Sequence, residues 1–171
     1  MTTTERVTAE QLSTVLEALI VLLQDAVDSG ASVGFLPPLS VDVARTYWQG
    51  TASDLAQGKR VLLVAHHHTQ AVGTVQLALA TQPNAQHRAE VQKIMVHTQV
   101  RQQGIGQALM TAIEEAARRA GRTLLVLDTR RDDVSEQLYL KQGYICGGII
   151  PHYARSARGV LDDTAIFYKV L

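Results

Sequence analysis

The most informative stretch of the sequence is a glycine-containing turn, Arg101-Gln102-Gln103-Gly104-Ile105-Gly106, which joins an expected strand to an expected helix. A turn that opens a helix leaves several backbone N–H groups without partners, and the positive end of the helix dipole lies behind them. Glycines at 104 and 106 let a bulky phosphate approach the main chain, because no Cβ stands in the way. The turn is therefore a candidate site for a pyrophosphate held without a metal.

Two other phosphate-binding motifs and a purely structural turn compete with this interpretation. A Rossmann fingerprint needs a third glycine three positions after Gly106, where the chain has Leu109, and it normally lies in the first strand–helix unit. A Walker A loop needs Gly-Lys-Ser/Thr, which this turn lacks. Two glycines in an ordinary tight turn are the preferred interpretation for an isolated motif, so the surrounding residues must decide.

Hydrophobic periodicity on both sides of the turn predicts a mixed α/β domain. Helices are expected over residues 9–28 (capped by Thr8), 41–57 (capped by Ser40), 104–120 and a short segment opened by Asp133. Strands are expected over 60–66, 71–80, 90–97, 124–128, 144–150 and 164–171, with a faint strand near Arg6 and loops over 31–39 and 151–163. Within the helix over 104–120, Glu114–Arg118 and Glu115–Arg119 are expected as ion pairs on the solvent side.

Composition excludes several classes of protein. The 171 residues correspond to about one domain, over 1–171, and 46% hydrophobic with 19% charged residues excludes disorder. Lys plus Arg and Asp plus Glu are 16 each, which argues against a nucleic-acid or anionic-lipid partner. Residues 61–87 carry no charge, but three histidines in their middle exclude a membrane helix. The single cysteine, Cys146, is expected to be buried in an apolar strand, and its lack of a disulfide partner indicates a reduced, cytoplasmic protein.

The residues around the turn resemble a known family. Val96-x4-Arg101-x2-Gly104-x-Gly106 and Leu-Tyr-x-Lys-x-Gly-Tyr at 138–144 resemble the motifs of the GNAT superfamily of acetyl-CoA-dependent N-acetyltransferases, in the family's order and over nearly the whole chain. Gln102 and Thr98 stand where glycine and proline are common, but the backbone amides of the turn remain. Segments 30–35, 83–96, 124–129 and 162–169 resemble the tabtoxin resistance branch, which acetylates the amine of a β-lactam amino-acid toxin.

The resemblance implies a fold and a cosubstrate site. The implied fold is a single domain of the α/β (α+β) class, whose twisted, mixed but mostly antiparallel sheet has about six to seven strands and about four flanking helices. Its middle strands are splayed to admit the pantetheine arm of acetyl-CoA. By the same resemblance, main-chain groups of Ile94 and Val96 hold the pantetheine, and the N–H of Val96 faces the thioester oxygen. The implied pyrophosphate site consists of Arg101, Gln102, Gln103, Gly104, Gly106 and Gln107.

Acetyl transfer from a thioester to an amine requires a base for the amine, donors for the oxyanion and an acid for the thiolate. Glu90, at the start of its strand, is the candidate base acting through a water; the alternative is a solvated strand-end glutamate. Asp128, beside the expected splay, shares the base role or orients the amine; the alternative is a turn or capping aspartate. Tyr139 matches the family tyrosine that faces the CoA sulfur; the alternative is a core tyrosine.

The acceptor pocket is expected between two loops, 30–36 and 151–163. The second loop carries side chains that either meet a substrate carboxylate or are simply solvated: Arg155, Arg158, His152 and Tyr153. Neighbouring strand residues alternate faces, so His66–His68 predict an exposed hairpin turn and no metal site. The predicted function is acetyl-CoA-dependent acetylation of a small-molecule amine, with a β-lactam toxin among the candidate acceptors. The alternatives are a protein N-acetyltransferase and a non-catalytic acyl-CoA sensor, and the sequence does not reveal an oligomeric state.

Overall fold

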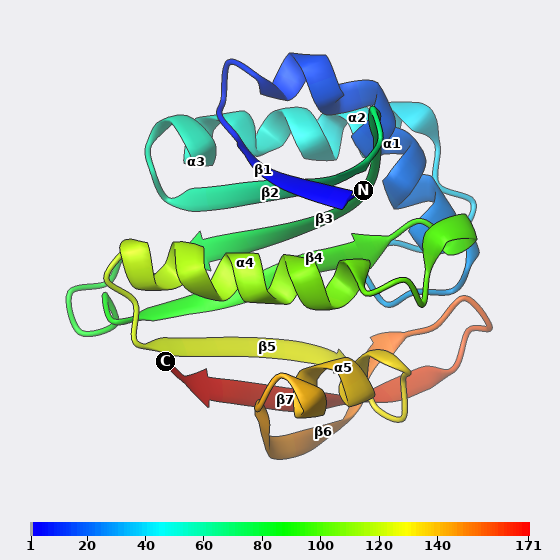
Figure 1. The fold of residues 1–171 in the computed structure, drawn as a ribbon. Coiled ribbons are helices and arrows are strands. Elements are labelled where there is room, and N and C mark those ends of the chain that lie inside the picture. Colours follow the sequence, from blue (N-terminus) through cyan, green and yellow to red (C-terminus); the bar gives the residue numbers. More distant parts are fainter. Residues whose placement is uncertain (1) are drawn as a thin grey trace.

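The computed structural model describes residues 2–171, in which the strands form one mixed sheet in the order β1-β2-β3-β4-β5-β7-β6 (Figure 1). Every neighbouring pair is antiparallel except the parallel pair β4 and β5. The strands are β1 (Thr2–Val7), β2 (Arg60–His67), β3 (Gln70–Leu79), β4 (Arg88–Val96), β5 (Leu124–Arg130), β6 (Ile145–Arg155) and β7 (Leu161–Val170). The helices of this part of the chain are α1 (Leu12–Asp28), α2 (Val41–Gly50), α3 (Ala52–Ala56), α4 (Ile105–Arg119) and α5 (Ser135–Lys141). The predicted mixed sheet is confirmed.

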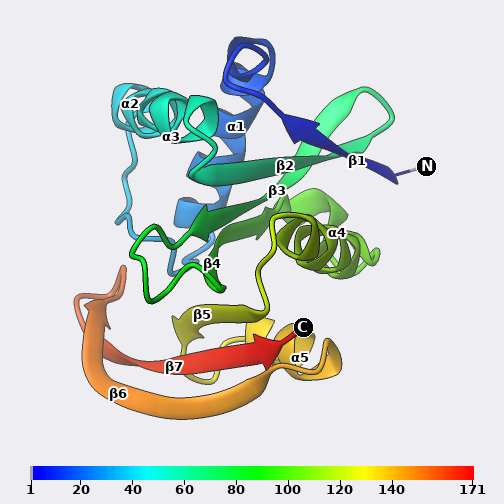
Figure 2. The same cartoon turned by 90° about the vertical axis from the view of Figure 1, so that its left-hand side faces the viewer.

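Apolar side chains cover both faces of this sheet. On β2, Val61, Leu63 and Ala65 belong to the core under α4, whereas Leu62 and Val64 belong to the core under α1. This alternation follows from the two-residue period of a strand. Figure 2 shows the result, with α1, α2 and α3 on one side of the sheet and α4 and α5 on the other. None of the helices in residues 2–171 has the length and hydropathy that a membrane crossing requires.

The predicted helix over 41–57 is wrong in one respect, because the segment contains two helices. Ser40 caps the first as expected, since its hydroxyl accepts a hydrogen bond from the N–H of Val43. At Thr51 both the backbone N–H and the side-chain hydroxyl donate to the carbonyl of Trp48, at 3.1 and 2.7 Å. A hydroxyl that bonds three residues back competes with the regular helical ladder. The helix therefore ends at Gly50 and restarts at Ala52.

The predicted loop over 151–163 is mostly strand. β6 continues to Arg155 and β7 already begins at Leu161, with Ala154 opposite Asp162. A short turn joins them, closed by the bond from Ser156 N–H to the Val160 carbonyl at 2.8 Å. Polar residues fit this hairpin because β6 is an edge strand and almost all of its residues are exposed. Cys146, on the same strand, is exposed as well, so its predicted burial is wrong.

Glu114 is the second residue whose predicted exposure is wrong. Its position on α4 was expected to face solvent, but only 5% of the residue is exposed. Its carboxylate accepts two hydrogen bonds from the Lys169 ammonium of β7, at 2.7 and 2.8 Å, and lies 3.9 Å from Arg118. The second expected pair, Glu115–Arg119, is on the surface as predicted, at 2.8 Å.

Candidate active site

A gap opens in the middle of the sheet, between β4 and β5. These strands pair only from Arg88↔Leu124 to Glu90↔Val126, whereas β4 stays paired with β3 as far as Val96. The β3–β4 register shifts at Lys93, whose φ is 50°, so that Lys93 and Ile94 stand opposite a single residue of β3. Such a bulge bends a strand and increases its twist. β4 therefore turns away from β5 (Figure 1), and the unpaired edge of β4 carries Ile94 and Val96.

The turn over residues 101–107 lies beyond this unpaired edge and leads into α4. Gln102 and Gly104 both have positive φ, 62° and 79°. Among the residues that the structure describes, none accepts a hydrogen bond from the backbone N–H groups of 102–107. Successive free N–H groups in such a turn form a concavity for an anion, and the N-terminus of α4 adds its dipole. The turn therefore offers the donors that a pyrophosphate needs.

Arg101 fixes this turn from the protein side. Its Nε donates to the carbonyl of Val96 at 3.0 Å, and its Nη2 donates to the hydroxyl of Ser29 at 3.0 Å. Ser29 ends α1, so one side chain ties the turn to β4 and to a helix on the other face of the sheet. The geometry fits Arg101 as a support of the turn, with its guanidinium engaged by protein oxygens.

Glu90 and Asp128 lie on the same face of the sheet, where the gap begins. Glu90 is in register with Val126, and Asp128 follows two residues later on β5, so both side chains point to the side of α1–α3. The Thr164 hydroxyl donates to Asp128 Oδ2 at 3.3 Å. Partial burial raises the pKa of Asp128, the bond from Thr164 opposes this, and the charge of Glu90 adds to the rise. The structure thus brings the two expected carboxylates together across the strands.

The pKa of Asp128 predicts how a variant responds to pH. Because burial raises this pKa in the folded chain, the folded state holds the proton more tightly, and ionising Asp128 lowers stability as pH rises through the folded pKa. We expect Asp128→Asn to raise the melting temperature at pH 7–8 by roughly 1–2 °C, a small change because Asp128 keeps contact with solvent. Below the unfolded pKa of about 3.9 the difference should vanish. Thermal unfolding against pH checks this, with the exposed Asp132→Asn as the control, and equal melting temperatures at pH 8 would contradict it.

Lys93 is a site residue that the sequence did not single out. Its ammonium lies 5.4 Å from the centre of the Tyr47 ring, and only 3.7 Å from where a Cβ on Gly34 would stand. Burial lowers the pKa of Lys93, the charge of Arg60 adds to this, and Asp128 and Glu90 act in the opposite direction. The alternating pattern of a regular strand does not predict where the Lys93 side chain lies, because the bulge at Lys93 changes its direction.

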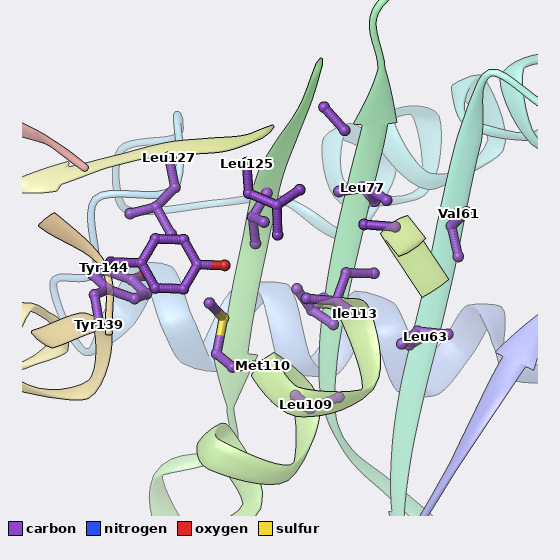
Figure 3. Close-up of a cluster of buried hydrophobic side chains, with 14 of the residues drawn as sticks. Val61, Leu63, Leu77, Leu109, Met110, Ile113, Leu125, Leu127, Tyr139 and Tyr144 are labelled. Carbon is purple, nitrogen blue, oxygen red and sulfur yellow. The ribbon is translucent and has the colours of Figure 1, made fainter. Parts of the chain in front are cut away.

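Tyr139 lies on the opposite face of the sheet from the two carboxylates. It is 4% exposed on α5, and its ring contacts those of Tyr144 and Phe167, with centroids at 6.1 and 5.8 Å. Figure 3 shows Tyr139 and Tyr144 at one end of the core under α4, near Leu127. Burial raises the pKa of Tyr139 above its ordinary value, so the phenol keeps its proton at neutral pH. The expected acid and the expected bases therefore stand on the two sides of the gap.

A cavity of about 260 Å³ lies between the loop over 30–37 and the β6–β7 hairpin. Arg130, at the end of β5, donates to the Gly30 carbonyl at 3.0 Å and lies 3.8 Å from Asp162, so it connects the two segments. The two segments expected to form the acceptor pocket are thus side by side. Of the four polar residues named for the second segment, Arg155 lines the cavity, Arg158 lines a wider depression beside it, and His152 and Tyr153 are exposed on β6.

The histidines stand apart from this site. The prediction of an exposed turn over His66–His68 holds only for His68, because His66 and His67 are half-buried residues of β2. His66 lies 3.0 Å from Glu5 of β1, and the rings of His67 and His68 meet edge to face where β2 ends. Over residues 2–171, no three or more His, Cys, Asp or Glu side chains are grouped to hold a metal ion.

Sequence comparison identifies the family of this chain. A family model described as "Acetyltransferase (GNAT) domain" matches residues 58–146, a range that contains β2 to β5, the turn and α5. An uncharacterized N-acetyltransferase from the hisH-hisA intergenic region of Azospirillum brasilense is 32% identical over 130 residues, which cover 72% of this chain and 76% of that protein.

Solved structures share the fold over the full length of the chain. A ribosomal-protein-alanine N-acetyltransferase from Brucella melitensis has a TM-score of 0.81 at 21% identity, covering 99% of each chain. The yncA protein of Salmonella typhimurium, solved with its cofactor acetyl-CoA, has a TM-score of 0.79 at 16% identity, covering 100% of this chain and 94% of that one. With the gap, the amide-lined turn and the two faces of the site in place, the sequence matches establish that the chain belongs to the GNAT family of acetyltransferases.

Proposed function

We propose that the protein transfers acetyl directly from acetyl-CoA to the amine of a small molecule, in a ternary complex. The observation that carries the proposal is the arrangement around the gap. Two carboxylates, Glu90 and Asp128, lie on one face, and a buried phenol, Tyr139, lies on the other. A reaction that removes a proton from an incoming amine and supplies one to a departing thiolate needs a base near the amine and an acid near the sulfur, and the two faces of the gap offer these two positions.

The residues present fit acetyl-CoA. Free N–H groups at Gln102, Gln103, Gly104, Gly106 and Gln107 match a pyrophosphate, with Arg101 holding the turn in place. The unpaired edge of β4 at Ile94 and Val96 matches an extended pantetheine arm, which can bind as an added strand. When bound, acetyl-CoA supplies an acetyl group activated as a thioester.

Each candidate catalytic residue then has one task. Glu90 accepts the amine proton through a water, and Asp128 orients the amine or shares the base role. The N–H of Val96 donates to the thioester oxygen, where negative charge develops. Tyr139 gives a proton to the departing sulfur and regains one from solvent.

The acceptor is proposed to be small because the neighbouring cavity is small. About 260 Å³ between the 30–37 loop and the hairpin lies just below the range typical of sites for small ligands. Arg155 donates to the Gly159 carbonyl at 2.7 Å and has no carboxylate partner among the described residues, so it is free to meet an acidic group of an amino-acid-like acceptor such as a β-lactam toxin. The exposed thiol of Cys146 fits a reducing, cytoplasmic location.

A thiol-release assay with acetyl-CoA tests the reaction and the acceptor together. The panel comprises amino acids, dipeptides, β-lactam amino acids, polyamines, aminoglycosides and one peptide with a free N-terminus. Release above the hydrolysis background with a single small amine supports the proposal, and mass spectrometry should show one added acetyl group. Release with the peptide alone would instead indicate a protein N-acetyltransferase. No release, with acetyl-CoA still raising the melting temperature, would indicate an acyl-CoA sensor.

Tyr139→Phe tests the proposed acid. We expect kcat to fall about 10²-fold, because the departing thiolate loses its donor, while the Kd for acetyl-CoA changes less than about twofold. Removing one hydroxyl from a ring that packs on Phe167 and Tyr144 should leave the melting temperature nearly unchanged. Steady-state kinetics and calorimetric titration measure the two quantities. Tyr144→Phe is the matched control, since that hydroxyl is buried without a partner in the described structure. Unchanged turnover in Tyr139→Phe would remove Tyr139 from the mechanism.

A further inference from the structure

A chain of polar side chains runs across the sheet to Glu90. Arg60, on β2, donates through Nη1 to the side-chain oxygen of Gln92 at 3.0 Å, and the amide nitrogen of Gln92 donates to Glu90 Oε1 at 2.9 Å. At its far end Arg60 lies 3.4 Å from Asp54 of α3. These groups lie on the same face of the sheet as Asp128 and share no contact with the glycine turn.

The guanidinium determines the direction of this chain. Arginine has only donors, so the side-chain oxygen of Gln92 must face Arg60, and the NH₂ group of Gln92 must then face Glu90. Glu90 therefore receives a hydrogen bond at a fixed oxygen, which orients its carboxylate and leaves its other oxygen for a water or an amine. The same Nη1 donates to Gln76 at 2.5 Å, and this bond likewise turns the Gln76 amide toward the Tyr47 hydroxyl, at 3.1 Å.

The second branch reaches the acceptor side of the site. The Tyr47 ring lies under the Lys93 ammonium and packs edge to face on Phe35, with centroids 5.3 Å apart. Phe35 lines the cavity between the 30–37 loop and the hairpin. The Arg60 side chain, which is 17% exposed, is thus hydrogen-bonded to Gln92, which holds Glu90, and to Gln76, which contacts Tyr47 and so leads to the cavity wall.

We propose that Arg60 and Gln92 are positioning residues, which hold the Glu90 carboxylate in one orientation, aimed at the gap. The inference rests on the proposed function, because it takes Glu90 as the base. Neither residue touches the substrates, and each acts through its hydrogen bond to the next. A purely structural role would predict that their loss affects stability and leaves the chemistry of Glu90 unchanged.

Gln92→Met, which removes both hydrogen bonds at similar volume, tests the proposal in a double-mutant cycle with Glu90→Gln. In the wild-type background we expect kcat to fall about tenfold, with the Kd for acetyl-CoA unchanged. The KM for the acceptor amine should change less than about twofold, because Gln92 orients the carboxylate and does not bind the amine. In the Glu90→Gln background the same change should cost less than about twofold in kcat, since no carboxylate base is left to position.

Control variants distinguish a failure of the positioning role from a failure of Glu90 as the base. Gln82→Met, at an exposed loop position, should leave kcat and KM unchanged. Arg60→Lys keeps a charge but loses the guanidinium fork, and we expect an intermediate loss of kcat; should it fold poorly, the Gln92 cycle stands without it. If Glu90→Gln lowers kcat but Gln92→Met costs the same factor in both backgrounds, the positioning role is wrong while the function stands. If Glu90→Gln costs nothing, both the base and its positioning are wrong.

Discussion

Glu90→Gln should lower kcat/KM for acetyl transfer about 10²- to 10³-fold at pH 7, because the amine loses its proton acceptor. The substitution changes charge with little change of shape. The side-chain oxygen of the new glutamine can still accept the bond that Gln92 donates to Glu90 Oε1. The loss should be most severe at low pH, where the acceptor amine is hardest to deprotonate, and should shrink as the free amine becomes abundant. Initial rates between pH 6 and 10 measure this trend.

Three variants make the result specific. Glu115→Gln, on the exposed side of α4, should leave the rate unchanged. Asp128→Asn should lower the rate less than Glu90→Gln if Asp128 mainly orients the amine. A larger loss at Asp128, together with a pH-independent loss at Glu90, would move the base to Asp128. For each variant, binding of acetyl-CoA should stay within about twofold, since the turn over 101–107 carries neither carboxylate.

The parts of the fold that could be predicted from sequence are those encoded locally. Thr8 and Gln11 exchange hydrogen bonds of 3.3 and 3.0 Å, but α1 begins at Leu12 with Gln11 before it, so the predicted cap at Thr8 lies three residues too early. These bonds and the hydrophobic stripe of α1 both depend on residues within one or two turns of each other. The same holds for the turn that opens α4, where glycine and the change of periodicity are adjacent in the chain.

The contacts that escaped prediction join residues far apart in sequence. Gln76 stands opposite Gln92 on β3 and β4, and Arg60 reaches both only because β2 lies beside β3 in one particular register. A single sequence shows that Glu90 and Gln92 share a face but does not give the register of the next strands. The bulge at Lys93 is equally invisible, because it is a mismatch between two strands.

Burial on the outer elements was the least predictable feature. The prediction that Cys146 is buried rested on the apolar residues around it, whereas β6 forms an edge of the sheet. The prediction that Glu114 faces solvent relied on an i,i+4 pair with Arg118, while its short hydrogen bonds go to a lysine 55 residues away. Charge patterns along one helix do not reveal what a distant strand places against it.

That distant lysine connects three elements. Lys169 of β7 donates to both carboxylate oxygens of Glu114 on α4, and it also donates to the Gln142 carbonyl at the end of α5, at 2.6 Å. Its ammonium lies 5.5 Å from the centre of the Tyr144 ring. The Glu114 side chain is 6% exposed, so its charge is largely removed from water and depends on these partners. α5 carries Tyr139, and the lysine therefore supports the helix that positions the proposed acid.

Lys169→Met should lower the free energy of unfolding by about 3–5 kcal/mol, because breaking a buried pair leaves an uncompensated charge. In a chain of this length that corresponds to a fall of roughly 10 °C in melting temperature. Glu114→Gln combined with Lys169→Met should recover more than half of this loss, since no buried charge remains, and chemical denaturation of the wild type and the two variants measures both effects. A loss below about 1 kcal/mol in the single variant would show that Arg118, 3.9 Å from the carboxylate, compensates for the lysine. The double variant should also regain acetyl transfer in proportion to its stability, because α5, which carries Tyr139, is then ordered again. A stable double variant that stays inactive would show that Lys169 supports Tyr139 through the Gln142 carbonyl rather than through the charge of Glu114.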